Sequence, residues 1–372
     1  MKELQKLLIC YIDNPVDYDL DFSNLVNFIK NEKVNENLEE QKEFFYLLLK
    51  IANNHSRQHN FRSKIENLLL YYSEEIKQHF SATEIIDIFK NNQLLIHLLI
   101  TNKIITVDRS IANLIIEKSE IKGSSSYLIF FYTEIEHFIE KEFLEIIKED
   151  INKIDSDIFN NFEVKRQKGE NDCYLSLLIR NDSVEEFVAY VNRANLPLKT
   201  TTIKPSIFET NSFLQNKTPT LIEYATFFAS IQIFQFLRYN NVELKSSLWL
   251  YAIHSNNPEF IHILEENKVK PPEESYKICV FEGIKCHHNE IVDYIIDTFL
   301  YDDAIDVSEI SIRYHNYAYF PNDLFQRDTF YYLYQNKYLT LVDLFMEKKK
   351  NEIEQEIISI HFNLIMKFII FV

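Results

Sequence analysis

The chain has 372 residues, 46% of them hydrophobic, and its 39 basic and 56 acidic side chains give a formal net charge of −17. This apolar fraction excludes an intrinsically disordered chain, and the length predicts two structural blocks or one long repeat array. Because a nucleic-acid-binding protein needs clustered Lys and Arg to neutralise phosphates, we expect no nucleic-acid partner.

Residues 1–164 are predicted to form a helical N-terminal region. Apolar side chains recur there at helical spacing, as in Phe44, Phe45, Leu48 and Leu49. Asn and Ser clusters punctuate the pattern at short intervals, which indicates short helices with short connections. The region is interpreted as a cap for a repeat array or as degenerate repeats of it. The charged, glycine-containing stretch 165–172 is the predicted boundary.

Glycine and cysteine counts limit the possible chemistry. Only three glycines occur in the chain, so the glycine-rich phosphate-binding motifs of kinases, P-loop NTPases and dinucleotide-binding folds are absent. Four scattered cysteines are too few to staple a chain of this length. The first residues also lack a signal-peptide core. We therefore expect a reducing, cytoplasmic environment.

An internal repeat is detectable between residues 218–244 and 245–271. Superposing the two segments at a spacing of 27 gives six identities, where about two are expected by chance. Further copies of the apolar pattern predict helix N-caps at Asn91 with Asn92, at Ser183 and at His288 with Asn289. The identities pair Leu221 with Leu248, Tyr224 with Tyr251, Ala225 with Ala252, Leu237 with Leu264, Asn240 with Asn267, and Val242 with Val269.

The order of residues in each copy resembles the ankyrin repeat. Thr220-Leu221-Ile222-Glu223-Tyr224-Ala225 matches the family's inner-helix motif, and residues 233–242 match its outer-helix motif. The segment from Ser206 to Asn289 is also similar to a large protist family of degenerate ankyrin-like proteins without an assigned function. The resemblance covers residues 165–350 and implies an all-α helical solenoid of ankyrin-like helix pairs. The period of 27 is shorter than the family's usual 33, and Asn or Lys replaces its consensus glycines.

The resemblance also implies a function and a set of contact residues. Ankyrin arrays bind proteins on a concave face built from inner helices and inter-repeat loops, so we expect a protein partner and a role as an interaction module or scaffold. The alternatives are a structural assembly subunit and, less favoured, a cryptic enzyme. For the aromatic pair at 227–228 the alternative is packing against the next repeat. The implied contact residues are Phe227, Phe228, His254, Ser255, Phe281 and Glu282 on inner helices, and Glu243, Lys245 and Lys270 in loops.

One Cys/His cluster could be considered for metal binding. Cys279, Cys286, His287 and His288 lack the spacing of common zinc sites, and the two histidines are adjacent in sequence. Cys279 aligns with Ala225 as a small packing residue, so packing beside a solvated turn is the preferred interpretation. No catalytic motif occurs, and the sequence predicts neither enzymatic activity nor a cofactor.

The C-terminal residues 351–372 are predicted to form a capping helix. Their most apolar part, Ile357–Val372, is interrupted by His361, Asn363 and Lys367. A membrane-spanning helix needs about 20 apolar residues, more than this stretch offers, so we expect a buried helix and no membrane anchor.

Overall fold

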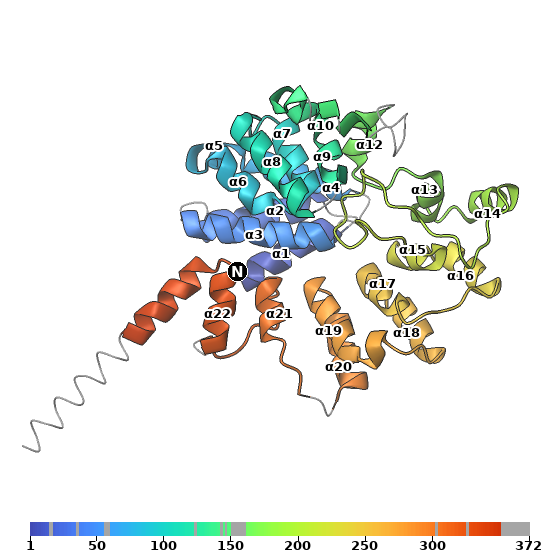
Figure 1. The fold of residues 1–372 in the computed structure, drawn as a ribbon. Coiled ribbons are helices and arrows are strands. Elements are labelled where there is room, and N and C mark those ends of the chain that lie inside the picture. The colour runs from blue at the N-terminus through green and yellow to red at the C-terminus, as the bar shows by residue number, and fades with distance from the viewer. Residues whose placement is uncertain are drawn as a thin grey trace, which may run out of the picture.

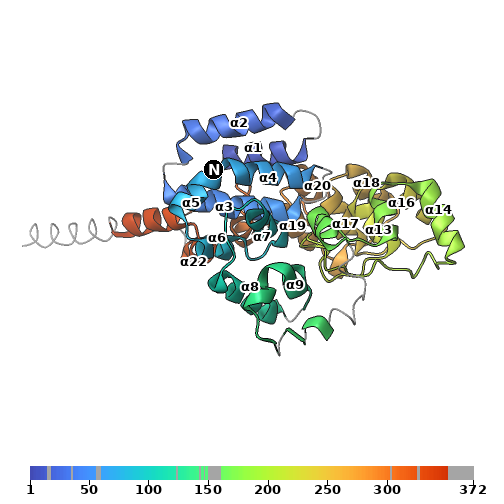
Figure 2. The ribbon, with the colours of Figure 1, turned by 90° about the horizontal axis from the view of Figure 1, so that it is seen from above.

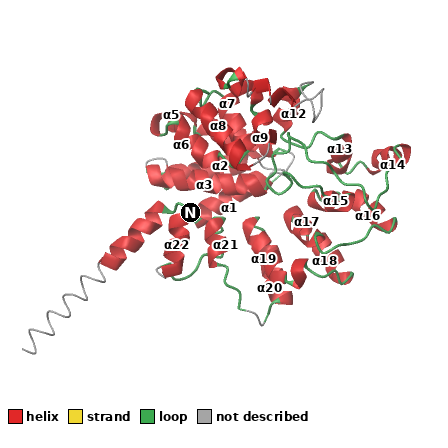
Figure 3. Cartoon of the chain, viewed as in Figure 1, coloured by secondary structure: helices red, strands yellow, loops and turns green. Residues whose placement is uncertain are grey.

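A computed structural model describes residues 1–14, 18–34, 37–55, 60–122, 125–141, 144–145, 147–149, 161–301, 304–324 and 327–350. Within these ranges the regular structure is entirely helical (Figure 3), which confirms the predicted all-α class. A single isolated bridge pairs Thr202 with Thr220, and the described residues contain no strand. The predicted C-terminal cap at 351–372 lies outside the described residues.

The N-terminal region is a cluster of helices around its own core. The longest helix, α3, places Phe44 and Phe45 in that core, where both rings pack on Tyr72. Asn37 begins α3 by accepting hydrogen bonds from two backbone N–H groups, which is the usual role of an N-cap side chain. The helices are α1 (Lys2–Asp13), α2 (Tyr18–Asn31), α3 (Leu38–Asn54), α4 (Phe61–Tyr71), α5 (Ser73–His79), α6 (Ala82–Phe89), α7 (Gln93–Thr101), α8 (Arg109–Lys122), α9 (Ser125–Phe130), α10 (Tyr132–Ile135), η2 (Glu136–Phe138) and α12 (Phe162–Lys168).

The second region consists of helices that pack in neighbouring pairs. Seen from above, most of them lie to one side of the N-terminal helices (Figure 2). A helix of residues 339–350 follows the last pair. The helices are α13 (Tyr174–Arg180), α14 (Val184–Arg193), α15 (Leu221–Phe227), α16 (Ile231–Tyr239), α17 (Leu248–Ser255), α18 (Pro258–Glu266), η3 (Pro272–Glu274), α19 (Tyr276–Lys285), α20 (Asn289–Phe299), α21 (Ser308–Arg313) and α22 (Arg327–Gln335).

Successive pairs stack in the order of the sequence. The first helices of the pairs contact one another in the series α13, α15, α17, α19 and α21. The second helices also meet, because Phe234 of α16 packs edge-on against Phe260 of α18 at a centroid distance of 4.9 Å. The two copies detected in the sequence correspond to α15–α16 and α17–α18. The small residues at the aligned position, Ala225, Ala252 and Cys279, are all fully buried.

Local sequence signals begin and end these helices. Thr220 and Glu223 form a reciprocal capping box at the start of α15. The predicted N-cap positions Ser183 and His288 precede α14 and α20. Asn256, which ends α17, has a left-handed φ of 50°, a conformation that Asn tolerates better than most residues. Asn thus replaces glycine in a chain with few glycines.

The predicted boundary at 165–172 starts as a helix. Lys165 to Lys168 complete α12, and the Arg166 side chain is only 2% exposed. Its guanidinium donates to Glu134 at 2.6 Å and to Glu163 at 2.8 Å. Gly169 then ends the helix with φ +67°, and a Cβ atom at this position would lie 2.9 Å from Thr210 Oγ1. The charged stretch is therefore the end of a helix, held by the ion pairs of Arg166, followed by a turn that requires glycine.

The N-terminal region packs directly on the helix stack, with α1 beside α21 (Figure 1) and Lys50 of α3 at 5.4 Å from the ring centroid of Tyr314. The Gln5 side chain of α1 donates to the carbonyl of His315 and accepts from the backbone N–H of Tyr317 at 3.1 Å. Ser212 donates to the carbonyl of Asn53 at 2.9 Å. Gln215 donates to Gln93 at 2.5 Å. These contacts join residues that are far apart in the sequence and fix the two regions against each other.

Helix α19 approaches its partner α20 at a glycine. A Cβ atom added to Gly283 would lie 2.5 Å from Cγ2 of Val292, inside van der Waals contact. We expect Gly283→Ala to lower the free energy of unfolding by about 1–3 kcal/mol, the usual cost of overpacking a core. Urea denaturation of the variant tests this, and Gly283→Ala combined with Val292→Ala should recover part of the loss. Unchanged stability of Gly283→Ala would contradict the close approach.

Candidate functional site

Three of the residues implied as partner contacts lie inside the protein. Phe227, His254 and Ser255 are each at most 3% exposed. The segment 203–220 covers Phe227 and His254, because Phe213 stacks on Phe227 at 5.7 Å and lies with its ring centroid 3.9 Å from that of His254. These inner-helix positions are core positions, so the expected surface role of these three residues has to be corrected. The packing alternative applies to Phe227.

Three other inner-helix positions are partly covered. Phe228 contacts Tyr224 at 4.8 Å and lies under the Arg180 guanidinium at 6.0 Å. Phe281 is half-buried against the same core. Glu282 is also half-buried and is held by an ion pair with Lys285 and a hydrogen bond with His254. Each of the three therefore presents part of its side chain to solvent.

The three implied loop residues are exposed. Glu243 and Lys245 follow α16 and line a hollow of about 260 Å³ together with Lys199. Lys270 follows α18, lines a second hollow of about 400 Å³, and pairs with Glu274 at 2.7 Å. We call these three residues, Glu243, Lys245 and Lys270, the loop edge. These are the members of the predicted contact set that are exposed rather than partly covered.

A buried polar cluster joins α17 to α19. His254 Nε2 lies 2.6 Å from a carboxylate oxygen of Glu282, which also accepts from Lys285 at 2.8 Å. Burial lowers the pKa of His254 to about 4 despite the opposing carboxylate, so His254 is neutral at pH 7 and donates through Nε2. Burial alone would raise the pKa of Glu282, but the His254 and Lys285 partners outweigh it and lower the pKa.

Cys286 completes this cluster but not in a reactive geometry. Its Sγ lies 3.5 Å from Nδ1 and 3.6 Å from Nε2 of His254. An atom equidistant from both ring nitrogens lies along the in-plane bonding direction of neither, since these directions diverge. The thiol is fully buried. Although a His, a carboxylate and a Cys are the elements of nucleophilic catalysis, this arrangement lacks the aligned thiol–imidazole hydrogen bond that such catalysis requires.

Within the described residues, His254, Glu282 and Cys286 of this cluster also have the proximity that a metal site needs, because their possible ligand atoms all lie within 4.8 Å of one another. A divalent ion there would compete with Lys285 for the Glu282 oxygen, and burial beside that ammonium disfavours added positive charge. The network therefore fits a structural role between neighbouring pairs. No motif in the sequence marks this network, although His254 and Glu282 lie about one repeat period apart, a spacing at which neighbouring repeats make contact.

His287 and His288 are buried as well, which corrects the expectation of a solvated turn. The N-terminal region covers them, and the ring of His55 lies 5.7 Å from that of His287 and 5.4 Å from that of His288. Cys279 lies apart in the helical core, where burial raises the pKa of its thiol to about 12. The Cys/His cluster of the sequence is thus divided among three places in the fold.

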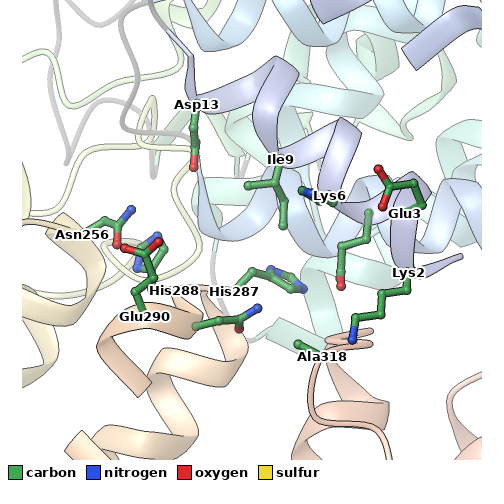
Figure 4. A pocket seen from close by; sticks show the side chains of 12 residues that line it. Lys2, Glu3, Lys6, Ile9, Asp13, Asn256, His287, His288, Glu290 and Ala318 are labelled. Atoms are coloured by element: carbon green, nitrogen blue, oxygen red, sulfur yellow. The ribbon is translucent and has the colours of Figure 1, made fainter. Parts of the chain in front are cut away.

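A pocket of about 680 Å³ opens beside these histidines, between α1 and the start of α20 (Figure 4). Lys2, Lys6 and Asp13 line the wall that belongs to α1. His287, His288 and Glu290 face them from the other side. The remaining lining residues are Glu3, Gln5, Ile9, Asn256, Asn289 and Ala318.

Comparisons with protein families, curated proteins and solved structures found no significant match to this chain. Among the described residues no helix is both long enough and apolar enough to cross a membrane.

Proposed function

We propose that this chain is a protein-binding scaffold built on an ankyrin-like solenoid and that its partner contacts the loop edge. The observation that carries the proposal is the stack of inner helices, α13 to α21, whose connecting loops present Glu243, Lys245 and Lys270 to solvent beside two hollows. Stacked repeats commonly bind through one extended surface of this kind. The sequence resemblance to ankyrin repeats points in the same direction.

The burial of the inner-helix positions moves the proposed contact away from the concave face. Phe227 and His254 are covered by the chain itself, so a partner that binds the folded protein reaches the loops and not these side chains. The charged loop edge favours a partner with complementary charge, which mainly increases the association rate at physiological salt.

Self-assembly is the second candidate function. Tyr174 is 50% exposed and Leu177 is 39% exposed on α13, the first helix of the stack, whereas the equivalent faces of later inner helices are covered by the preceding pair. An open apolar end of a repeat stack can receive another molecule, because end repeats normally need a polar cap. Analytical ultracentrifugation of the purified chain distinguishes a monomeric scaffold from an assembly subunit.

The experiment that tests the scaffold proposal is capture of partner proteins from source cells by the wild-type chain and by a Lys245→Glu/Lys270→Glu variant. We expect a stoichiometric heterologous protein with the wild type and at least a tenfold weaker affinity with the variant. Lys77→Glu on α5, another exposed lysine, is the matched control and should bind normally. Equal binding by the loop variant would refute the loop edge, and a co-purifying metabolite without a protein would favour an enzyme.

A further inference from the structure

A mostly apolar hollow of about 440 Å³ lies where the N-terminal region meets the end of the helix stack. Leu4 of α1 and Phe28 of α2 line it together with Phe320, which follows α21, and with Leu341 of the helix at 339–350. It shares no lining residue with the two hollows beside the loop edge. Small-molecule sites are concave, mostly apolar and of this order of size.

Aromatic rings form part of the wall of this hollow. The ring centroid of Phe320 lies 4.7 Å from that of Tyr317 and 5.6 Å from that of Tyr338. Phe28 adds a fourth ring to the lining. Aromatic faces pack against apolar groups and also attract cations. The wall therefore suits a ligand with an apolar body, including one that carries a positive charge.

Glu43 of α3 places a buried carboxyl group in the same wall. Its side chain is 5% exposed, and its Oε1 is buried without a hydrogen-bond partner. Burial raises the pKa of Glu43, although Thr340 and the amino group of Met1 oppose this. A buried carboxylate is costly unless a cation or several hydrogen-bond donors face it. The position of Glu43 is thus explained by a positively charged group bound in the hollow.

Two further oxygens beside the hollow are buried without a hydrogen bond. They are Oγ1 of Thr340 and the phenolic oxygen of Tyr317, and both residues line the hollow. Native structures keep few buried polar atoms unsatisfied without a reason such as a bound group. A water molecule satisfies hydroxyl oxygens but leaves the charge of a carboxylate uncompensated. A cationic hydrogen-bond donor satisfies both the hydroxyls and Glu43.

The charge of the lining also favours a cation. Glu32 is exposed, Glu40 is half-buried and Glu43 is buried, so carboxyl groups occur from the surface to the interior of the hollow. Among the described residues of the lining there is no Lys or Arg, and the amino group of Met1 is the one cationic group. A cleft lined by one sign of charge concentrates ligands of the opposite sign.

We propose that this hollow is a binding site for a small primary ammonium ion with an apolar body, such as an arylalkylamine. An ammonium group has three N–H donors. They match the three oxygens of Glu43, Thr340 and Tyr317, while the apolar body packs among Leu4 and Phe320. A ligand in this place contacts both the N-terminal region and the end of the helix stack, so it stabilises the junction between them.

The test is calorimetric titration and thermal melting of the full chain with three ligands of similar shape: 2-phenylethylamine, 2-phenylethanol and 3-phenylpropionate. We expect one equivalent of the amine to bind and to raise the melting temperature, as a ligand specific for the folded state does. The alcohol should bind about tenfold more weakly or worse, because it lacks a charge-assisted hydrogen bond to Glu43. The propionate, which has the charge of the lining, should not bind.

Glu43→Gln should weaken binding of the amine about tenfold or more and leave the affinity for the alcohol unchanged. Glu259→Gln, which removes an exposed carboxylate on α18, is the matched control and should bind the amine normally. Equal affinity of the wild type for amine and alcohol, or no binding of the amine, would overturn the proposal. So would full affinity of Glu43→Gln for the amine, or an equal loss in Glu259→Gln. If Glu43→Gln does not fold, the comparison of the three ligands with the wild type decides the question.

Discussion

Replacing Phe227 with alanine should lower the free energy of unfolding by about 3–5 kcal/mol, the usual cost of deleting a buried phenyl ring. The ring is 1% exposed and packs between Phe213 and His254, which belong to a loop and to the next inner helix. Phe228→Ala is the natural comparison, because that ring is only half-buried and its removal should cost about 1–2 kcal/mol. Urea denaturation of both variants, followed by circular dichroism, measures the difference.

The pair of variants also tests which residue meets a partner. A partner that binds the loop edge should bind Phe228→Ala with nearly normal affinity as long as the variant is folded. If Phe227→Ala were as stable as the wild type, segment 203–220 would not cover the inner helices, and the concave face would return as the contact surface. If Phe228→Ala kept its stability but lost binding, this half-buried ring would be an anchor.

The sequence was sufficient for the local part of the fold. The predicted N-cap Asn92 acts within its own helix, and the small residues Ala225 and Ala252 act between neighbouring helices. The contacts of these residues involve positions within about one repeat period, so a comparison of the repeats detects them. Even the contact between Phe227 and His254, one period apart, follows from the register.

The covering of the inner helices could not be predicted in the same way. Phe213 lies in a segment without helical periodicity, and nothing in its sequence indicates that it stacks on Phe227. His55 meets His287 although the two lie in different regions of the chain, and a single histidine at a helix end carries no pattern. The resemblance to ankyrin repeats implied an exposed concave face because that is the family's arrangement. In this chain segment 203–220 covers Phe227 and His254, which belong to that face.

Two buried titratable groups should make stability depend on pH in opposite senses. Burial, with the nearby charges of Arg166 and Arg62, lowers the pKa of His97 from 6.5 to about 3. Between pH 3 and pH 6.5 the unfolded chain therefore binds a proton on His97 that the folded chain does not. The free energy of unfolding consequently falls as the pH drops below 6.5. At pH 5 this amounts to about 2 kcal/mol.

Glu209 shifts the other way. Burial raises the pKa of Glu209 from 4.5 to about 7, although a hydrogen bond from the backbone N–H of Asn211 and the charge of Arg180 oppose this. Between pH 4.5 and 7 the folded chain holds a proton that the unfolded chain has released. The protonated Glu209 carboxyl therefore contributes about 3 kcal/mol to the free energy of unfolding below pH 4.5. This contribution is lost as the pH rises through 7.

Glu209→Gln and His97→Phe should separate these two contributions when the free energy of unfolding is measured by urea denaturation at pH 5 and at pH 8. Relative to the wild type, Glu209→Gln should gain up to about 3 kcal/mol at pH 8 compared with pH 5, because the amide keeps the acceptor for Asn211 without a charge. His97→Phe should gain about 2 kcal/mol at pH 5 compared with pH 8, since phenylalanine cannot be protonated. Any packing change contributes equally at both pH values and cancels in each difference.

Two outcomes would contradict these expectations. A variant that changes the free energy of unfolding by the same amount at pH 5 and pH 8 would show that its group is not buried in the folded chain. A reversed sign for Glu209→Gln would show that Arg180 stabilises the carboxylate by more than burial destabilises it.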